Sequence, residues 1–212
     1  MKSKTKSVLL LLSGELREER VVRRLARQAD LVVCADGGAR HARTLAVVPD
    51  IIVGDMDSLP HPAPKSWGKT AYCCDFDETS SDFEKALDFL AALGAVRVFV
   101  AGALGGGLDH EMVNLAVLEE RAKNLDFVLI GGGAARLLGP GRHRLSLKKG
   151  ERFSLLAAPS ALVSLTGARY PLRSERLARG SRGLGNRSEG RAVLDIKRGR
   201  VWLAVDAGLF RG

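Results

Sequence analysis

Residues 81–100, SDFEKALDFLAALGAVRVFV, hold the local pattern that decides the fold class. Apolar side chains recur at helical spacing over residues 82–93, which predicts an amphipathic helix. Ser81 followed three residues later by Glu84 is a capping-box pattern, so the helix should begin there. A strand-length segment that is apolar except for Arg97 then follows at residues 96–100. The stretch therefore predicts a helix that leads into a buried strand.

The same alternation of strand and helix signals extends over the first 140 residues. Strands that alternate with helices and are apolar on both faces predict an α/β fold with a mostly parallel sheet. The other predicted strands are residues 8–12, 31–34, 51–53 and 127–130, and the other predicted helices are residues 15–28 and 110–123.

After residue 140 the helix signal ends and short strands predict a small antiparallel β-domain. The predicted strands are residues 145–147, 153–157, 162–165, 192–196 and 201–205. Residues 1–140 hold 17 Lys and Arg against 19 Asp and Glu, whereas residues 141–212 hold 16 against 5. This asymmetry and the Gly139-Pro140-Gly141 cluster predict two domains, 1–140 and 141–212.

Composition excludes several classes of protein. The chain has 212 residues, of which 46% are hydrophobic and 27% charged, so wholesale disorder is excluded. No apolar run approaches the roughly 20 residues that span a bilayer, and the run at 8–12 is too short for a signal peptide, so we expect no membrane partner. Cys34, Cys73 and Cys74 lack CxxC spacing, which predicts reduced thiols in the cytoplasm.

The basic second segment is compatible with three interpretations. Its positive charge could be a solvated face, a site for a small anionic ligand, or a nucleic-acid surface. Few aromatic residues are interleaved with the basic ones, which weakens the nucleic-acid interpretation. We therefore expect small-molecule partners and no nucleic acid.

Two acidic motifs follow predicted strands. Asp36-Gly37-Gly38 follows residues 31–34, where the glycines let the backbone approach a ligand and a new helix favours an anion. A capped strand-to-helix turn is the alternative. In PDIIVGDMDS, residues 49–58, an extended chain points Asp55 and Asp57 to the same side, with Cα atoms about 6–7 Å apart. Such carboxylates repel each other unless a cation bridges them, although a solvated acidic turn remains possible.

Two further motifs flank predicted helices. Residues 75–84 carry five carboxylates, more than a helix cap needs, although the capping box alone explains Asp82. Residues 102–110, GALGGGLDH, form a glycine-rich loop that can cradle phosphates, and Asp109 could simply cap the next helix. Carboxyl ends of parallel strands meet at one edge of a sheet. Together the four motifs predict Mg²⁺-dependent handling of a nucleoside triphosphate.

These motifs occur in a distinctive order: DGGA at 36–39, GDMDS at 54–58, SDFEKAL at 81–87, GGxxDHxxxN at 105–114 and LTGARYPL at 165–172. In that order they resemble the thiamine pyrophosphokinase (thiamine diphosphokinase) family. The resemblance implies a Rossmann-like N-terminal domain, a C-terminal thiamine-binding β-sandwich, and a homodimer whose active sites are shared between subunits. It also implies one-step transfer of the pyrophosphoryl group of ATP to the hydroxyl of thiamine, with release of AMP.

The resemblance also implies residue roles. Asp55, Asp57 and Asp82 would be catalytic and would hold Mg²⁺. The implied nucleotide-binding residues are Asp36, Gly37, Gly38, Gly105, Gly106, Asp109 and Asn114, and the implied thiamine-binding residues are Glu78, Gly185 and Asn186.

Two departures from the family pattern bear on the substrates. Gly107 stands where the family usually has Arg, and Arg40, Arg136 or Arg142 are candidate replacements. Residues 185–187, Gly-Asn-Arg, stand in place of the family's Ser-Asn-Glu. The altered acceptor motif leaves open a diphosphokinase for another heteroaromatic alcohol, such as a 6-hydroxymethylpterin. A non-enzymatic nucleotide- or RNA-binding protein is the third alternative.

Overall fold

The computed structural model describes residues 6–121 and 125–206 of the chain. Within it the chain divides into two compact units, Met1–Gly132 and Gly133–Gly212. No helix among the described residues is both long and apolar enough to cross a membrane.

The division falls earlier in the chain than the Gly139-Pro140-Gly141 cluster that the sequence indicated. These three residues lie inside the second unit: Gly139 and Pro140 connect β7 (Ala134–Leu138) to β8 (Gly141–Arg144), and Gly141 begins β8. Strand β7 pairs along its length with the last strand, β11 (Asn186–Val205). This pairing places β7 with the β-rich unit, so the division falls at the Gly131-Gly132-Gly133 run rather than at residues 139–141.

The first unit is built on a six-stranded sheet in which every strand runs parallel to its neighbours. The order across the sheet is β6-β5-β1-β2-β3-β4. Its strands are β1 (Lys6–Leu11), β2 (Leu31–Ala35), β3 (Ile51–Gly54), β4 (Ala71–Cys74), β5 (Ala95–Ala101) and β6 (Asp126–Ile130). The predicted parallel α/β class is confirmed.

The order of the strands reverses at β1, which pairs with β2 on one side and with β5 on the other. In open α/β sheets, ligands bind outside the carboxyl ends of the strands at such a reversal. The segments that leave β1, β2, β3 and β5 at this edge carry most of the predicted site residues. The topology therefore places these residues together before any side chain is considered.

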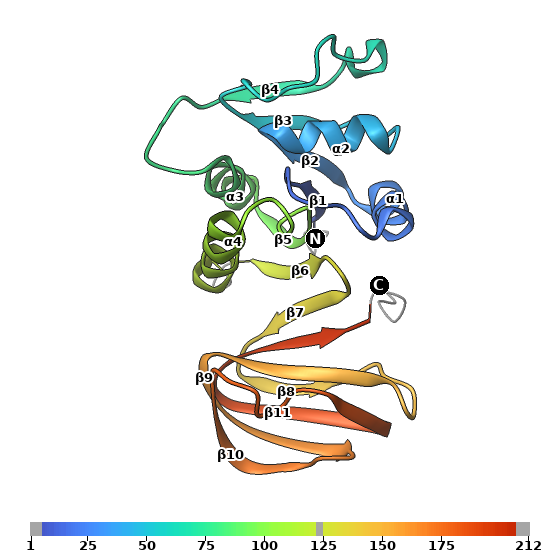
Figure 1. The fold of residues 1–212 in the computed structure, drawn as a ribbon, viewed down its shortest axis with the longest axis vertical. Helices are drawn as coiled ribbons and strands as arrows, with labels where there is room; N and C mark the ends of the chain where they lie inside the picture. Colours follow the sequence, from blue (N-terminus) through green and yellow to red (C-terminus); the bar gives the residue numbers. More distant parts are fainter. Residues whose placement is uncertain (1–5, 122–124, 207–212) are drawn as a thin grey trace, which may run out of the picture. The chain divides into compact units, whose positions relative to one another are not determined.

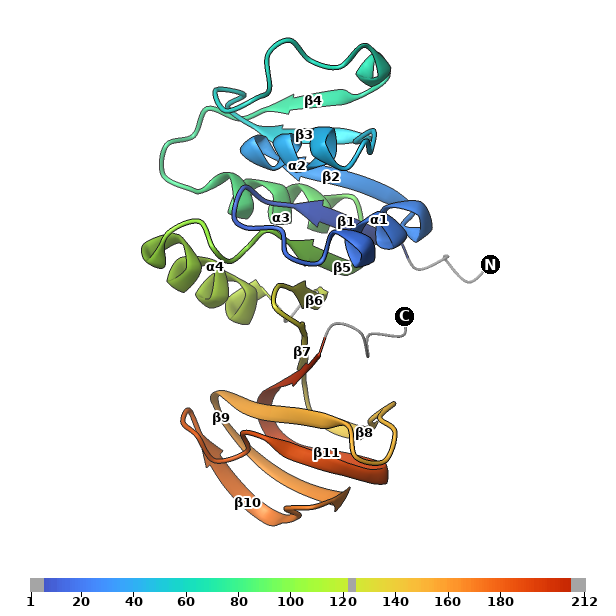
Figure 2. The same cartoon turned by 45° about the vertical axis from the view of Figure 1, so that its right-hand side comes forward.

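Helices cover both faces of this sheet, with α1 and α2 on one face and α3 and α4 on the other (Figures 1 and 2). The α-helices are α1 (Glu19–Gln28), α2 (Ala39–Thr44), α3 (Asp82–Ala92) and α4 (Leu108–Arg121). There are also two single-turn 3₁₀ helices, η1 (Asp36–Gly38) after β2 and η2 (Lys65–Trp67) between β3 and β4. Residues 122–123 of the predicted helix 110–123 lie outside the described residues.

Helix α3 begins where its capping box predicted. The Ser81 hydroxyl accepts the Glu84 N–H, and the Glu84 carboxylate accepts the Ser81 N–H at 3.2 Å. The helix buries Ala86, Leu87 and Leu90 against the sheet. This fixed starting point holds Asp82, the first residue of the helix, at the edge of the sheet.

Among the strands of this unit, β4 is the one that the sequence did not predict. Its residues Ala71, Tyr72 and Cys74 are exposed, and it pairs with β3 only, at the end of the sheet. An exposed edge strand needs neither an apolar run nor strict alternation. Its position is therefore set by backbone pairing with β3, which its composition does not reveal.

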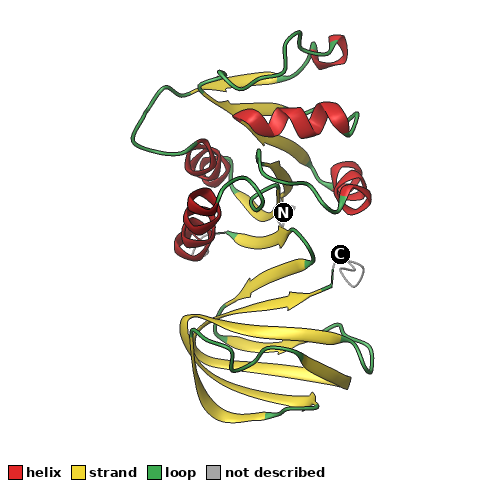
Figure 3. Cartoon of the chain, viewed as in Figure 1, coloured by secondary structure: helices red, strands yellow, loops and turns green. Residues whose placement is uncertain are grey.

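The second unit consists of strands, as Figure 3 shows. Its two longest are β9 (Arg152–Ala168) and β11, and β10 (Leu172–Ala178) pairs antiparallel with β9. Strand β11 is antiparallel to β7 and β8, and its partners on β9 run in the opposite order to its own residues. The antiparallel prediction is confirmed.

The strands of this unit differ in position from the prediction: each long strand had been divided in two, and β7, β8 and β10 were not predicted. Predicted strands 153–157 and 162–165 are halves of β9, and 192–196 and 201–205 are halves of β11. Polar and glycine residues between the halves mark bends of continuous strands rather than turns. Residues 145–147 do not form a strand, although Leu145 and Leu147 are buried in the core of this unit.

Both long strands line one apolar core and bend around it. Phe153 and Leu165 of β9 and Leu194 of β11 are at most 1% exposed. At the bend of β11, Gly199 has a φ of +85° and lies against Ser160, so a Cβ would overlap the Ser160 carbonyl oxygen. Glycine is therefore required there for the strand to bend over the core.

This requirement gives a stability prediction. Gly199→Ala should lower the free energy of unfolding by about 2 kcal/mol or more, because the new methyl group meets backbone at a positive φ. Gly180→Ala is the matched control, since nothing lies within 4 Å of a Cβ there. Urea denaturation of both variants measures the difference, and equal stability of the two would contradict the bend as described.

Candidate functional site

A pocket of about 680 Å³ lies at the carboxyl edge of the parallel sheet. Its walls come from the segments that follow β1, β2, β3, β4 and β5 and from the first turns of α3 and α4. The pocket therefore occupies the position where the strand order reverses, and its volume is in the range of small-molecule sites.

Three carboxylates gather where β2 and β3 end. Oxygen atoms of Asp36, Asp55 and Asp57 all lie within 4.8 Å of one another. Asp55 accepts the Asp57 N–H at 3.2 Å, and the Ser58 hydroxyl donates to Asp57 at 2.9 Å. The predicted proximity of Asp55 and Asp57 is present, and Asp36, which the resemblance assigned to the nucleotide, lies beside them.

Asp36 is held in an unfavourable environment for a carboxylate. Its side chain is 3% exposed, its φ is +31°, and one oxygen accepts the Ser58 N–H at 3.2 Å. The other oxygen, Oδ1, is buried with no hydrogen-bond partner among the described residues. Burial raises the pKa of Asp36, the Ser58 hydrogen bonds oppose this shift, and the charges of Asp82 and Asp57 add to it.

Asp82 also lies close to Gly54. A Cβ on Gly54 would lie 2.8 Å from the Asp36 Cβ and 2.9 Å from an Asp82 carboxylate oxygen. Burial raises the pKa of Asp82, Lys85 lowers it, and the charges of Asp55 and Asp57 raise it further. The glycine at the end of β3 thus lets carboxylates from three segments approach one another.

This donor set fits a hard divalent cation. All of its ligand atoms are carboxylate oxygens, which Mg²⁺ prefers, and the unpartnered Asp36 Oδ1 is a buried acceptor that a cation would satisfy. Asp36, Asp55 and Asp57 could hold such an ion, with Asp82 adjacent. Without a cation, like charges this close destabilise one another.

The loop between β4 and α3 is organised by Asp77. Its carboxylate accepts the Thr79 N–H at 2.9 Å and hydroxyl groups of Thr79 and Ser80, which lower its pKa. Asp75 in turn accepts the Asp77 N–H at 3.0 Å. Of the five carboxylates predicted here, these two therefore shape the loop, and Glu78 is exposed on the pocket wall.

The glycine loop after β5 forms another wall. Asn114 of α4 donates its side-chain amide to the Ala103 carbonyl at 2.9 Å, which holds the start of the loop. The Gly105 N–H donates to Glu111 at 2.6 Å, so that group is already occupied, and Gly106 lines the pocket. Asp109 is exposed, accepts the His110 N–H at 2.9 Å and does not line the pocket.

The Asp-Gly-Gly turn after β2 brings its backbone against strand β1. A Cβ on Gly38 would overlap the Leu11 carbonyl, and a Cβ on Gly37 would lie 3.0 Å from the Arg40 guanidinium. Arg40 lines the pocket, whereas Arg136 and Arg142 line a different cavity in the second unit. Of the three arginines proposed to replace the missing one at Gly107, Arg40 is therefore the one beside the acidic residues.

Sequence reasoning gave no role to Lys85, which lines this pocket from α3. The motif SDFEKAL contains the residue, but nothing in the motif indicates that its side chain lines a pocket. At 3.6 residues per turn, Lys85 lies on the other side of α3 from Phe83, Leu87 and Leu90, so the hydrophobic periodicity could not have identified it as buried.

The predicted acceptor residues of the second unit have structural hydrogen bonds. Asn186 is buried, accepts the Tyr170 and Arg187 N–H groups, and donates to the Tyr170 carbonyl at 2.8 Å. The Gly185 N–H donates to Ser154 at 3.1 Å. Asn186 also lines a cavity of about 380 Å³ beside the exposed Tyr170 and Leu184.

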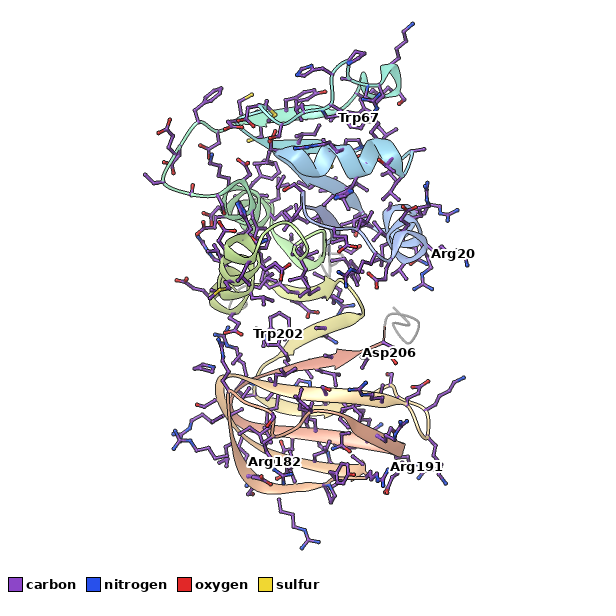
Figure 4. All side chains as sticks on the ribbon, viewed as in Figure 1. Arg20, Trp67, Arg182, Arg191, Trp202 and Asp206 are labelled. Atoms are coloured by element: carbon purple, nitrogen blue, oxygen red, sulfur yellow. The ribbon has the colours of Figure 1, made fainter. Side chains whose placement is uncertain are left out.

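Much of the positive charge of the second unit is solvated. Arg182 and Arg191, both labelled in Figure 4, are exposed, and Arg182 pairs with Glu175 of β10 at 2.7 Å. Exposed ion pairs of this kind contribute little to stability. The solvated-face interpretation therefore accounts for these arginines.

The family described as "Thiamin pyrophosphokinase, catalytic domain" matches residues 22–129. The chain belongs to this family. The matched segment begins in α1 and ends in β6, so it contains the acidic cluster, the glycine loop and most of the residues that line the pocket. Members of the thiamin pyrophosphokinase family are transferases.

Known proteins of this family are similar over most of the chain. Thiamine pyrophosphokinase 1 of Oryza sativa subsp. japonica is 29% identical and covers 72% of this chain and 69% of its own. The crystal structure of thiamine pyrophosphokinase from Bacillus subtilis superposes with a TM-score of 0.80 at 20% identity, over 95% and 99% of the two chains. That of Candida albicans gives 0.75 at 18% identity, over 95% and 90%. These structures share the fold.

The acidic cluster gives a prediction that separates catalysis from stability. Asp57→Asn should lower thiamine pyrophosphokinase turnover by about two orders of magnitude or more, through loss of a metal ligand. The melting temperature without metal should stay unchanged or rise, because repulsion among the carboxylates is relieved.

Asp88→Asn serves as the matched control for Asp57→Asn. Asp88 is an exposed acid on α3 that pairs with Arg121, away from the pocket, so both turnover and melting temperature should be retained. A large loss of stability in Asp57→Asn would instead mean that the acidic turn is structural.

Proposed function

We propose that the protein transfers the pyrophosphoryl group of ATP to the hydroxyl of thiamine, giving thiamine diphosphate and AMP. The hydroxyl oxygen forms a bond to the β-phosphorus, and the bond between that phosphorus and the oxygen bridging to the α-phosphate breaks. AMP carries away the bonding electrons, and the hydroxyl proton is released. Family membership favours this reaction over the pterin and nucleic-acid alternatives.

One observation carries the proposal: carboxylates from three segments meet at the pocket edge around Gly54. Their mutual repulsion and the unpartnered oxygen of Asp36 have no structural benefit that we can identify. Transfer of a phosphoryl group depends mainly on positioning and on neutralising charge, and a preformed acidic cluster beside a glycine loop supplies both through a bound cation.

We propose Mg²⁺ as the cofactor, held by Asp36, Asp55 and Asp57, with Asp82 beside them. When bound, Mg²⁺ neutralises polyphosphate charge and orients the transferred group. Ser58 orients Asp36 and Asp57 by hydrogen bonds to both. Asp82, whose pKa is raised by burial, lies next to this cluster at the start of α3, where it can accept the proton of an incoming hydroxyl.

The remaining ligand contacts follow from the pocket walls. Gly106 offers free backbone beside the acidic residues, and Arg40 supplies a positive charge for the ATP phosphates. For the acceptor we propose Glu78 in the first unit and the Gly185-Asn186 turn of the second. Because the Asn186 amide holds Tyr170, it would act on thiamine by shaping this turn.

We further propose a homodimer, supported by an exposed apolar surface on α4. Leu108, Met112 and Val113 are 74%, 65% and 49% exposed. Contiguous exposed apolar side chains usually mark an interaction surface. A second copy fits this face because its basic segment, residues 141–212, complements the acidic pocket rim.

The free thiols of the chain support a cytoplasmic location.

The reaction is tested by AMP release from Mg-ATP with purified protein, with and without thiamine. We expect AMP only when thiamine and Mg²⁺ are both present, and loss of the signal on addition of EDTA. AMP formed with a hydroxymethylpterin instead would keep the chemistry and change the acceptor. Binding of ATP with no AMP from any acceptor would contradict the proposed reaction.

The dimer is tested by Met112→Glu, which places a charge in the apolar surface of α4. Sedimentation should show a dimer for the unaltered protein and a monomer for the variant, because a buried unpaired charge opposes association. Val48→Glu is the control, since Val48 is 47% exposed outside α4. A dimer that persists in Met112→Glu would place the interface elsewhere.

A further inference from the structure

Lys85 places a buried ammonium group at the floor of the pocket. Its side chain is only 6% exposed, and it lines the pocket together with Asp55 and Asp82. Its neighbours on the helix surface include Asp82, one turn before it, and Phe89, one turn after it. Lysine is rarely buried to this extent unless it is paired, so the residue requires an explanation.

The partners of Lys85 within the protein leave donor capacity unused. Nζ donates to the Asp75 carbonyl at 3.0 Å, and it lies 3.6 Å from Asp82 Oδ1, which is ion-pair distance and too long for a good hydrogen bond. An ammonium group has three N–H donors. At least one donor therefore remains for a ligand in the pocket that the side chain lines.

Stability alone does not account for a lysine at this position. A buried ion pair is often no more stabilising than apolar residues of the same volume, because both charges lose their hydration. Met or Leu would fill the same buried position at lower cost. Lys85 also lies beside an acidic cluster that must accept a polyanion, where a cation reduces repulsion between Asp82 and phosphate oxygens.

We propose that Lys85 binds the diphosphoryl portion of ATP by donating a charge-assisted hydrogen bond to its non-bridging oxygens. This inference rests on the proposed function and adds a residue to its site. The ammonium group of Lys85 stays in place while negative charge shifts among the phosphate oxygens during transfer. It therefore stabilises the transition state. Of these two cations that line the pocket, Arg40 is exposed and Lys85 is buried.

The proposal is tested by calorimetric titration of Lys85→Met with inorganic pyrophosphate in the presence of MgCl₂. We expect affinity for pyrophosphate to fall about 10- to 100-fold, as for loss of a charge-assisted hydrogen bond. Affinity for Mg²⁺ alone should stay equal or increase, because a positive charge beside the carboxylates has been removed. Lys85→Arg should restore part of the pyrophosphate affinity.

The sign of the Mg²⁺ effect separates binding from positioning. If Lys85 only held Asp82 and the Asp75 loop in place, Lys85→Met would weaken Mg²⁺ and pyrophosphate together, and the proposal would be overturned. Unchanged affinity for pyrophosphate would also overturn it. Lys65→Met, which removes an exposed lysine of η2, is the matched control and should leave both affinities unchanged.

The titrations also distinguish this inference from the proposed reaction. Weakened pyrophosphate binding in Lys85→Met, with no thiamine-dependent AMP from the unaltered protein, would support the phosphate contact and contradict the reaction. An unaltered protein that binds neither Mg-ATP nor pyrophosphate would overturn both. If Lys85→Met does not fold, Lys85→Gln keeps the length and polarity of the side chain and takes its place with the same expected signs.

Discussion

Repulsion among the carboxylates of Asp36, Asp55, Asp57 and Asp82 is the constraint around which the first unit is organised. The sheet edge brings them together, and the small volume of Gly54 lets Asp36 and Asp82 flank the end of β3. Burial and neighbouring charges raise the pKa of Asp36 and of Asp82, so their ionised forms are disfavoured in the folded protein. The stability of the rest of the sheet must therefore compensate for this edge.

The parallel core can supply that compensation because the acidic residues are all at strand ends. Val8, Leu9, Leu10 and Leu11 of the central strand β1 are fully buried. None of the acidic residues interrupts a ladder, since each follows a strand or begins a helix. Sheet order therefore separates the stabilising part of the unit from its functional edge, which is the arrangement that lets open α/β sheets carry strained, charged sites.

The sequence predicts those parts of the molecule that local patterns determine. Helix α3 begins at its capping box, and the strands of the parallel sheet that coincide with apolar runs lie where predicted. Strand β4 was not predicted because an exposed edge strand depends on pairing rather than on its own hydrophobicity. The sequence analysis divided the long strands β9 and β11 because bends and turns contain the same types of residue. Only the packing around Gly199 shows that the strand continues through it. For the site, the spacing of Asp55 and Asp57 indicated that these two residues act together. Asp36 joins them, and Lys85 lines the same pocket, because the fold brings together segments that are distant in sequence.

Charge balance in the pocket explains why an arginine in the glycine loop is not required by this architecture. A Cβ at Gly107 would lie 2.9 Å from the Asp109 carboxylate, so an arginine there would begin beside an acid on α4 rather than beside the cluster around Gly54. The cluster needs positive charge close to its own carboxylates, and Lys85 and Arg40 line the same pocket as Asp55 and Asp82. In the proposed function, a divalent cation on the carboxylates would add to the positive charge that Lys85 and Arg40 bring to this pocket. Because electrostatic stabilisation in a site of this kind depends on preorganised charge near the reacting group, the distribution of cations matters more than the presence of any one of them at its usual position in the sequence.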